Sequence, residues 1–123
     1  IDLLKKSKAA GPKRMVSFVP AHPFAFGSLD VRAVHYRRYT RQRLRDLSLR
    51  FAPEADFQVR SFNFPGLVGW YINGILIKQQ KVGGGTVGLF DALMPVIRPV
   101  DTVLTDWLKF PLGQSLISVL TIP

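Results

Sequence analysis

The sequence predicts an α/β fold in which helices are layered on one sheet. Apolar runs of strand length alternate with segments of helical periodicity, in the order helix, strand, helix, strand, helices, strand. Glycine and proline mark many of the boundaries, and the 123 residues show no internal repeat and no linker between domains. A chain of this length forms one domain at most.

A short helix and a strand open the chain. Residues 2–10 can form a helix that ends at Gly11-Pro12, because glycine suits a helix C-terminus and proline cannot continue the helix. Met15–Val19 is a nearly continuous apolar run that ends at Pro20. Such a run is typical of a strand that is buried on both faces, so we expect helices on both sides of it.

A loop and a capped helix follow this strand. Ala21–Leu29 is predicted to be a loop with aromatic side chains, and Asp30–Val34 a helical turn. Thr40 can cap a helix that runs to about Arg50, because its hydroxyl can accept a hydrogen bond from an unpaired N–H group of the first turn. The helical period places two sets of side chains on different faces of this helix. The expected inner face carries Leu44, Leu47 and Phe51, and the expected outer face carries Arg41, Arg45 and Arg50.

A strand, a helix and a loop are predicted in the middle of the chain. Phe57–Arg60 alternates between apolar and polar residues, which predicts a half-exposed strand near a sheet edge. The apolar run Phe64–Ile77 predicts a buried or partly buried helix, and Lys78–Gly85 predicts a flexible loop. The apolar run is shorter than the roughly 20 residues that a membrane-spanning helix needs, so we expect no transmembrane segment.

Two further helices and a strand complete the prediction. Thr86 can cap the first helix, which we expect to be interrupted at Pro95 and stopped by Pro99. Asp101 can cap a second, shorter helix. The segment Gln114–Ile122 reads as the last strand.

Composition limits the classes of function. The apolar fraction of 47% excludes a disordered chain. Seventeen Lys and Arg against eight Asp and Glu give a net charge of +9, which favours anionic partners such as nucleic acid, phosphorylated substrates or a membrane surface. The absence of cysteine excludes disulfides and thiolate metal sites, and two histidines are too few to favour a metal site. The first residues do not resemble a signal peptide. They also lack an initiator methionine, so we expect either a piece of a longer protein or a trimmed chain.

His22 is a candidate functional residue because it directly follows the predicted buried strand. In open α/β sheets, ligands bind outside the carboxyl ends of the strands. The alternative interpretation is that His22 is an ordinary polar loop residue. Gly83-Gly84-Gly85 does not follow a strand, as a phosphate-binding loop would, and we interpret it as a flexible connector.

The segment Val34–Arg45 contains five arginines and two tyrosines in twelve residues. One interpretation is the solvated face of an amphipathic helix. The alternative is an anion-binding segment, because tyrosines alternate with the arginines and because cations in a first helical turn are unfavourable unless an anion lies nearby. No helix-turn-helix, zinc-finger or aromatic RNA-binding motif accompanies the segment.

Several blocks of the sequence carry a resemblance to a known family. Three lie in the first half: Met15–Pro20 with Ala21-His22-Pro23, then Phe26–Asp30, then His35–Thr40. Others follow: Phe62-Asn63, Gly66, Gly69-Trp70, Asn73-Gly74, Leu89-Phe90-Asp91, Pro95 and Pro111–Leu116. Together they make the chain similar to the second half of class I S-adenosylmethionine-dependent methyltransferases, in particular bacterial ones.

The resemblance implies a partial Rossmann-like sheet with flanking helices. In this family the strand order is 3-2-1-4-5-7-6, and the seventh strand is antiparallel to the others. Met15–Val19 would be the fifth strand, Asp56–Phe62 the sixth and Gln114–Ile122 the seventh. Residues 1–123 would then form a single partial domain, the C-terminal half of the methyltransferase fold.

The resemblance also implies S-adenosylmethionine as the cofactor of the parent family. The family binds it with an acidic-x-Gly-x-Gly loop after the first strand and with an acidic residue at the end of the second. These 123 residues contain no such loop. We therefore expect the acceptor-side portion of a methyltransferase that is cytoplasmic, binds no cofactor by itself and is inactive alone.

Six candidate site residues follow from the resemblance. Two of them, His22 and His35, are the catalytic candidates, because histidine titrates near neutral pH and can act as a general base or orient the acceptor. In similar enzymes the first would lie at the strand end that faces cofactor and substrate, and the second in the loop that lines the acceptor pocket. The candidate substrate-binding residues are Pro20, Ala21, Arg37 and Tyr39.

Two hypotheses about function remain open at this point. The first is a methyltransferase portion, and the second is a stand-alone basic module that binds nucleic acid or another polyanion. Under the first hypothesis, the strand Met15–Val19 lacks a neighbour and leaves an apolar unpaired edge. We then expect a homo-oligomer, or a complementing N-terminal half, that pairs with this edge.

Overall fold

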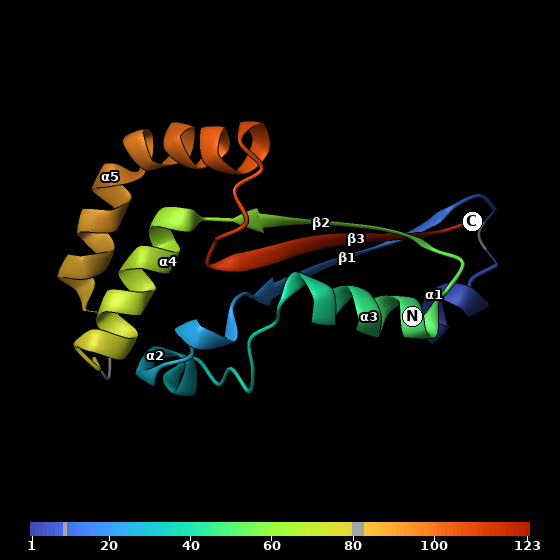
Figure 1. The fold of residues 1–123 in the computed structure, drawn as a ribbon, viewed down its shortest axis with the longest axis horizontal. Helices are drawn as coiled ribbons and strands as arrows, with labels where there is room; N and C mark the ends of the chain where they lie inside the picture. Colours follow the sequence, from blue (N-terminus) through green and yellow to red (C-terminus); the bar gives the residue numbers. More distant parts are fainter. Residues whose placement is uncertain (9, 80–82) are drawn as a thin grey trace.

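A computed structural model describes residues 1–8, 10–79 and 83–123, and it shows an α/β chain built on a three-stranded antiparallel sheet (Figure 1). The strand order is β1 (Lys13–Pro20), β3 (Ser115–Ile122) and β2 (Asp56–Phe62). The central strand β3 is antiparallel to both neighbours. The described sheet is therefore antiparallel throughout.

The helices follow the predicted order along the chain. They are α1 (Asp2–Lys6), the 3₁₀ turn η1 (Pro23–Ala25), α2 (Ser28–Arg32), α3 (Arg41–Phe51), α4 (Phe64–Tyr71), the π-helical turn η2 (Ile72–Leu76), α5 (Gly84–Thr102) and the π-helical turn η3 (Val103–Trp107). No described helix is long and apolar enough to cross a membrane.

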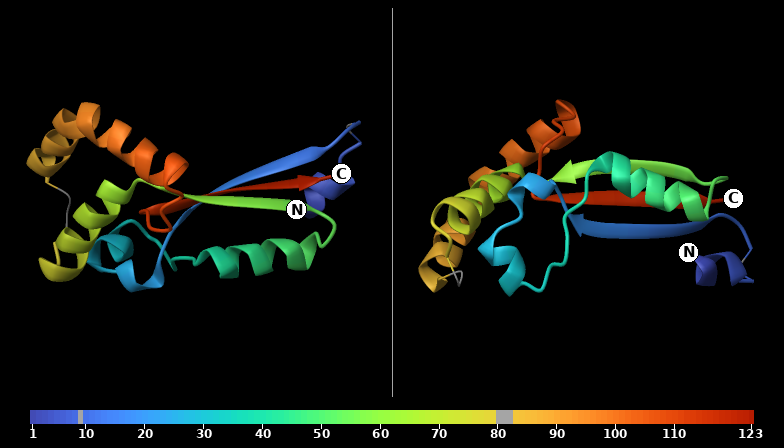
Figure 2. Two further views of the ribbon diagram at one scale, coloured as in Figure 1. Left: turned by 45° about the horizontal axis from the view of Figure 1, so that its top comes forward. Right: turned by 60° about the horizontal axis from the view of Figure 1, so that its bottom comes forward.

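One face of the sheet carries the core. Both views in Figure 2 show α3 lying along this face, with α1 near the end of the sheet where β3 finishes. Leu116 and Leu120 of β3 are the largest fully buried apolar side chains there, as expected for the central strand. The buried core residues form two clusters, Ala21 with Leu44 and Leu116, and Ala52 with Leu120 and Ile122.

The opposite face of the sheet is open. The prediction that Met15–Val19 is buried on both faces is wrong, because Val16 is 67% exposed and Phe18 is 63% exposed. The ring of Phe18 contacts the ring of Phe62 across β3, with centroids 6.0 Å apart, and both rings lie on this open face. Among the described residues β1 pairs only with β3 along its length, so its outer edge is unpaired, as expected.

The capped helix α3 begins where predicted but turns a different face to the sheet. Thr40 Oγ1 accepts a hydrogen bond from Arg43 N at 3.1 Å, which confirms the cap. Leu44 is buried as expected, whereas Leu47 is 45% exposed. Phe51 is exposed as well. These two side chains line a groove of about 440 Å³ between α3 and β1, because α3 packs over β3 and β2 and leaves the β1 side uncovered.

Arg41, which was expected on the outer face of α3, is half-buried instead. Its Nη2 donates to Ser61 Oγ at 3.0 Å. The Ser61 hydroxyl in turn donates to Pro111 O at 2.7 Å. This chain of hydrogen bonds ties the start of α3 to β2 and to the turn before β3.

The helix α5 corrects three predictions. It begins at Gly84, before the predicted cap Thr86, and it continues through Pro95 and Pro99 instead of being interrupted at the first and stopped by the second. Figure 1 shows α5 bending near its middle, which is how a helix accommodates the hydrogen bonds that prolines remove. The predicted loop Lys78–Gly85 lies partly outside the described residues, which omit 80–82.

Asp101 does not cap a separate helix; it stabilises the start of α4. Its carboxylate accepts hydrogen bonds from Asn63 N at 2.9 Å and from Phe64 N at 2.7 Å. Asn63 is the residue before α4 and Phe64 is its first residue, so neither N–H group has an intrahelical acceptor. The bonds therefore join the end of α5 to the beginning of α4.

Candidate functional site

Two neighbouring segments of the chain and the distant helix α4 meet around one buried carboxylate, that of Asp30. This residue lies on α2 and is fully buried, with 0% of its surface exposed. The surrounding donors come from the residue before α2, from the segment after it and from α4. These segments belong to the blocks that carry the family resemblance.

The Asp30 carboxylate accepts four hydrogen bonds. Oδ2 accepts from Gly27 N at 3.0 Å and from Trp70 Nε1 at 2.9 Å. Oδ1 accepts from His35 Nδ1 at 3.0 Å and from Arg38 Nε at 2.9 Å. Burial acts to raise the pKa of Asp30, but the hydrogen bonds from Trp70, Arg38, Gly27 and His35 outweigh it and hold the pKa below its ordinary value. Asp30 is therefore an anion at neutral pH.

The position of α2 depends on its contact with η2. Ser28 Oγ donates to Gly74 O at 3.0 Å and to Gln79 O at 2.7 Å. Gly27 approaches the same segment so closely that a Cβ atom there would lie 2.6 Å from Gly74 O. A side chain at position 27 would push α2 away from η2, so glycine is needed for this approach.

His35 has one ring nitrogen fixed by Asp30 and the other available. Because the carboxylate can only accept, Nδ1 carries the hydrogen, and in the neutral ring Nε2 is the nitrogen with the lone pair. No described residue forms a hydrogen bond with Nε2. The ring stacks on Trp70 with centroids 6.2 Å apart and is 36% exposed. The pair therefore presents an oriented imidazole that can accept a proton from a bound molecule.

Arg38 holds the carboxylate cluster against the end of β1. Its guanidinium is only 3% exposed and donates through Nη1 to Ala21 O at 2.8 Å. It also lies over the Trp70 ring, 5.5 Å from the centroid. A buried cation needs a paired anion, and Asp30 supplies it.

The predicted residues Pro20, Ala21 and His22 lie together at the carboxyl end of β1. Tyr39 forms a short parallel bridge with Ala21. In this bridge Tyr39 N donates to Pro20 O at 2.8 Å, and His22 N donates to Tyr39 O at 3.0 Å. The segment 35–39 is thereby held directly beside the end of the strand.

His22 has an unusual backbone conformation, with φ at +60°. A non-glycine residue in such a conformation costs on the order of 1–3 kcal/mol, which is typical of functional sites. Its Nε2 accepts a hydrogen bond from Gly113 N at 3.4 Å, and its ring lies 5.3 Å from that of Phe24. Burial lowers the pKa of His22, and the charges of Arg38 and Arg41 lower it further, so the ring is neutral at pH 7.

Two predicted site residues play other parts in the structure. The Tyr39 ring packs against the core cluster of Ala21, Leu44 and Leu116. Arg37 is exposed and lines a surface groove of about 390 Å³ with Arg43 and Arg50. No described contact joins Arg37 to either histidine.

Sequence reasoning missed three members of the cluster: Asp30, Arg38 and Trp70. One signal was present, since Asp30 is the only acidic residue between Leu3 and Arg45. A lone carboxylate in such a basic stretch is a natural partner for a buried cation. Nothing comparable singled out Trp70, whose role depends on the packing of α4 against α2.

The described residues contain no group of three His, Cys, Asp or Glu side chains that can hold a metal ion. No protein-family model matches this chain, and comparisons with curated proteins and with solved structures find no match either. The class of protein therefore has to be argued from the strand order and from the geometry of the site.

Proposed function

We propose that this chain is the C-terminal, acceptor-side portion of a class I S-adenosylmethionine-dependent methyltransferase. The observation that carries the proposal is the meeting of Phe26–Asp30, His35–Tyr39 and Gly69–Gly74, three segments of the family resemblance, around Asp30. The strand order β1-β3-β2 with an antiparallel centre supports it, because the sheet of this family ends in the same way. The site also lies at the carboxyl end of β1, where ligands bind in open α/β sheets.

The residues present do not supply a site for the cofactor. The chain contains no acidic-x-Gly-x-Gly loop. The only carboxylate at the candidate site is that of Asp30, and its oxygens already accept bonds from four protein donors, which leaves no free oxygen to hold ribose hydroxyls. We derive no step through S-adenosylmethionine and assign these residues to the acceptor.

His35 is the proposed general base. An oxygen or nitrogen acceptor that gains a methyl group loses a proton, and His35 Nε2 is oriented to take it because Asp30 holds the hydrogen on Nδ1. Asp30 stabilises the imidazolium that this transfer would form. His22, which is neutral and held by Gly113, is proposed to orient the acceptor by a hydrogen bond from Nδ1.

The complementing half is proposed to pair with β1. The outer edge of β1 is unpaired, the groove between α3 and β1 is apolar, and Val16 and Phe18 are exposed on the other face. An additional strand would pair with the edge, and helices connected to it would cover the groove and the open face.

Calorimetry with S-adenosylmethionine tests the proposal. We expect no binding to this chain alone. We expect binding to the longer polypeptide encoded when the reading frame is extended upstream of Ile1, and we expect an His35→Asn variant of it to bind the cofactor normally but transfer methyl groups slowly. Tight binding of S-adenosylmethionine to the short chain would refute the proposal that this chain lacks a cofactor site. Failure of the extended chain to bind it would refute the methyltransferase assignment.

A second candidate function, a basic module that binds polyanions, is favoured by the groove of Arg37, Arg43 and Arg50. None of these arginines forms an ion pair among the described residues, although Asp46 also lines the groove, where it accepts a hydrogen bond from Gln42. If the groove binds nucleic acid, the affinity should fall steeply with salt, with a slope set by the number of phosphates contacted. A triple Arg37→Gln, Arg43→Gln, Arg50→Gln variant should then flatten this slope, and no binding at low salt would exclude the function.

A further inference from the structure

The continuous helix α5–η3 exposes a stripe of apolar side chains. They follow one another at intervals of four and three residues, so within each limb of the bent helix they lie on one face. The stripe consists of Leu89, Leu93, Val96, Val100, Val103 and Trp107, which are 46 to 81% exposed. No described residue covers this face.

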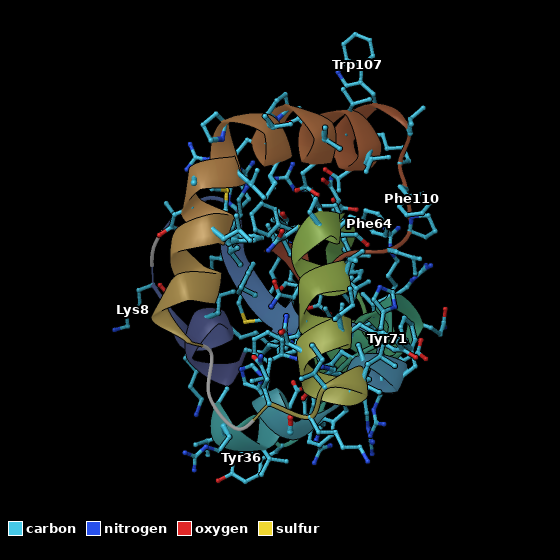
Figure 3. All side chains as sticks on the ribbon, turned by 90° about the vertical axis from the view of Figure 1, so that its left-hand side faces the viewer. Lys8, Tyr36, Phe64, Tyr71, Trp107 and Phe110 are labelled. Atoms are coloured by element: carbon cyan, nitrogen blue, oxygen red, sulfur yellow. The ribbon has the colours of Figure 1, made fainter. Side chains whose placement is uncertain are left out.

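The neighbouring helix adds a second group of exposed apolar side chains. Figure 3 shows α4 and α5 side by side at one end of the molecule, with Trp107 projecting away from the ribbon and Tyr71 on α4. The exposed apolar residues of α4 and η2 and the residue after η2 are Val68, Tyr71, Ile72, Leu76 and Ile77. Monomeric proteins rarely expose apolar surface on this scale unless it contacts a partner or a membrane. We call α4–η2 with α5–η3 the helical arm.

The unpaired charges of the arm are mostly cationic. Asp101 is occupied by the N–H groups before α4, and Asp106 forms an ion pair with Arg60 at 3.0 Å. Lys78, Arg98 and Lys109 have no ion-pair partner among the described residues, which leaves Asp91 as the opposing charge. Lys78 and Lys109 lie just after η2 and η3, so the unpaired positive charges at the ends of the arm favour contact with a negatively charged surface.

The end of the arm has the residue types that anchor proteins at a membrane interface. Trp107 is 81% exposed and is followed by Leu108, which is 66% exposed, and by Lys109. Tryptophan prefers the headgroup region, and lysine can extend its charge to the lipid phosphates while its stem stays among apolar groups.

We propose that the helical arm binds the surface of an anionic lipid bilayer, with its apolar stripe inserted at the boundary between headgroups and acyl chains. The arm lies in the interface and does not cross it, because no described helix is suited to span a membrane. Binding of the arm to a bilayer requires neither the Asp30 cluster nor methyltransferase activity, so the two proposals can fail separately.

The test uses the 123-residue chain and two kinds of vesicle, phosphatidylcholine alone and phosphatidylcholine mixed with phosphatidylglycerol. We expect co-sedimentation with the mixed vesicles and a shift of tryptophan emission to shorter wavelength. Each of the three cations should strengthen binding to the anionic vesicles by roughly fivefold. A Trp107→Phe variant should still bind but lose most of the emission shift, because Trp70 is partly buried and hydrogen-bonded to Asp30 away from the stripe.

A matched pair of variants tests whether vesicle binding depends on the arm or on exposed apolar side chains in general. Replacing Leu93, Val96 and Val100 by serine should weaken vesicle binding by at least about tenfold, since each side chain contributes burial free energy in the membrane. Replacing Val16 and Phe18, which are exposed to a similar degree on the open sheet face, should leave binding unchanged. Equal loss in both variants would overturn the proposal, as would no binding to anionic vesicles. A dimer in light scattering that only the arm variant dissociates would also overturn it, because a second copy would then cover the stripe.

Discussion

Trp70 and Asp30 lie 40 residues apart in the sequence, and the indole Nε1 of the first donates to Oδ2 of the second at 2.9 Å. This bond joins α4 to α2 across the candidate site. The same indole stacks on His35 and lies under the guanidinium of Arg38. Trp70 thus contacts all three polar members of the cluster and fixes their relative positions.

Replacing Trp70 by phenylalanine should therefore destabilise the protein. The ring volume is partly kept, but one oxygen of a buried carboxylate loses a donor, which costs about 1–3 kcal/mol in the free energy of unfolding. Urea denaturation measures the change. The matched control is Trp107→Phe, which removes a donor from a side chain that is 81% exposed and should change the stability by less than about 0.5 kcal/mol. Equal effects of the two substitutions would contradict the role of the Trp70 bond.

An Asp30→Asn substitution should be more damaging. It removes the anion that pairs with Arg38, whose side chain is 1% exposed, and leaves an uncompensated buried cation. Breaking such a pair costs about 3–5 kcal/mol. An Asp46→Asn substitution, on the exposed face of α3, serves as the control and should be nearly neutral. Thermal unfolding followed by circular dichroism distinguishes the two, and a stable Asp30→Asn protein would show that the cluster does not organise this end of the fold.

The order of helices and strands was predictable because it depends on local periodicity and on the turns that glycine and proline favour. The burial of β1 was not predictable. An apolar run shows which side chains favour burial, but it does not show whether other elements of the chain pack over them. Val16 and Phe18 are apolar and yet exposed for this reason. The effect of Pro95 and Pro99 on α5 was overestimated, because a proline removes one hydrogen bond of a helix but does not always end it.

The candidate site was predictable only in part. His22 could be selected because it directly follows a strand and the end of a strand is a known place for ligands, whereas His35 was selected only through the family resemblance. The partners of His35 depend on contacts between α2 and α4, and no local pattern encodes those contacts. Asp101 shows the same limit: its sequence neighbours predicted a cap on its own helix, whereas its carboxylate serves the start of α4.

The lowered pKa of His22 should make the folding stability depend on pH below neutrality. Between the lowered pKa of the folded state and the ordinary value of about 6.5, the unfolded chain binds more protons than the folded one. Stability should therefore be full above pH of about 6.5 and decrease as the pH falls below it. His22→Asn, which tolerates the positive φ, should remove this part of the pH dependence. Urea denaturation of both proteins at several pH values measures the difference, and parallel pH profiles would contradict it.

The unpaired edge of β1 leads to a prediction about association. A strand edge next to an apolar groove and an open apolar face is a template for pairing with another chain. In the absence of a complementing half, we expect this chain to form dimers or larger assemblies at high concentration, measured by light scattering. Val16→Lys with Phe18→Lys places two charges beside the edge and should shift the protein toward the monomer. The control is Tyr36→Lys, at a side chain that is 88% exposed and distant from the sheet, which should not change the assembly. If the unmodified chain is a monomer at every concentration, the edge does not mediate association, and its exposed side chains would then need another explanation.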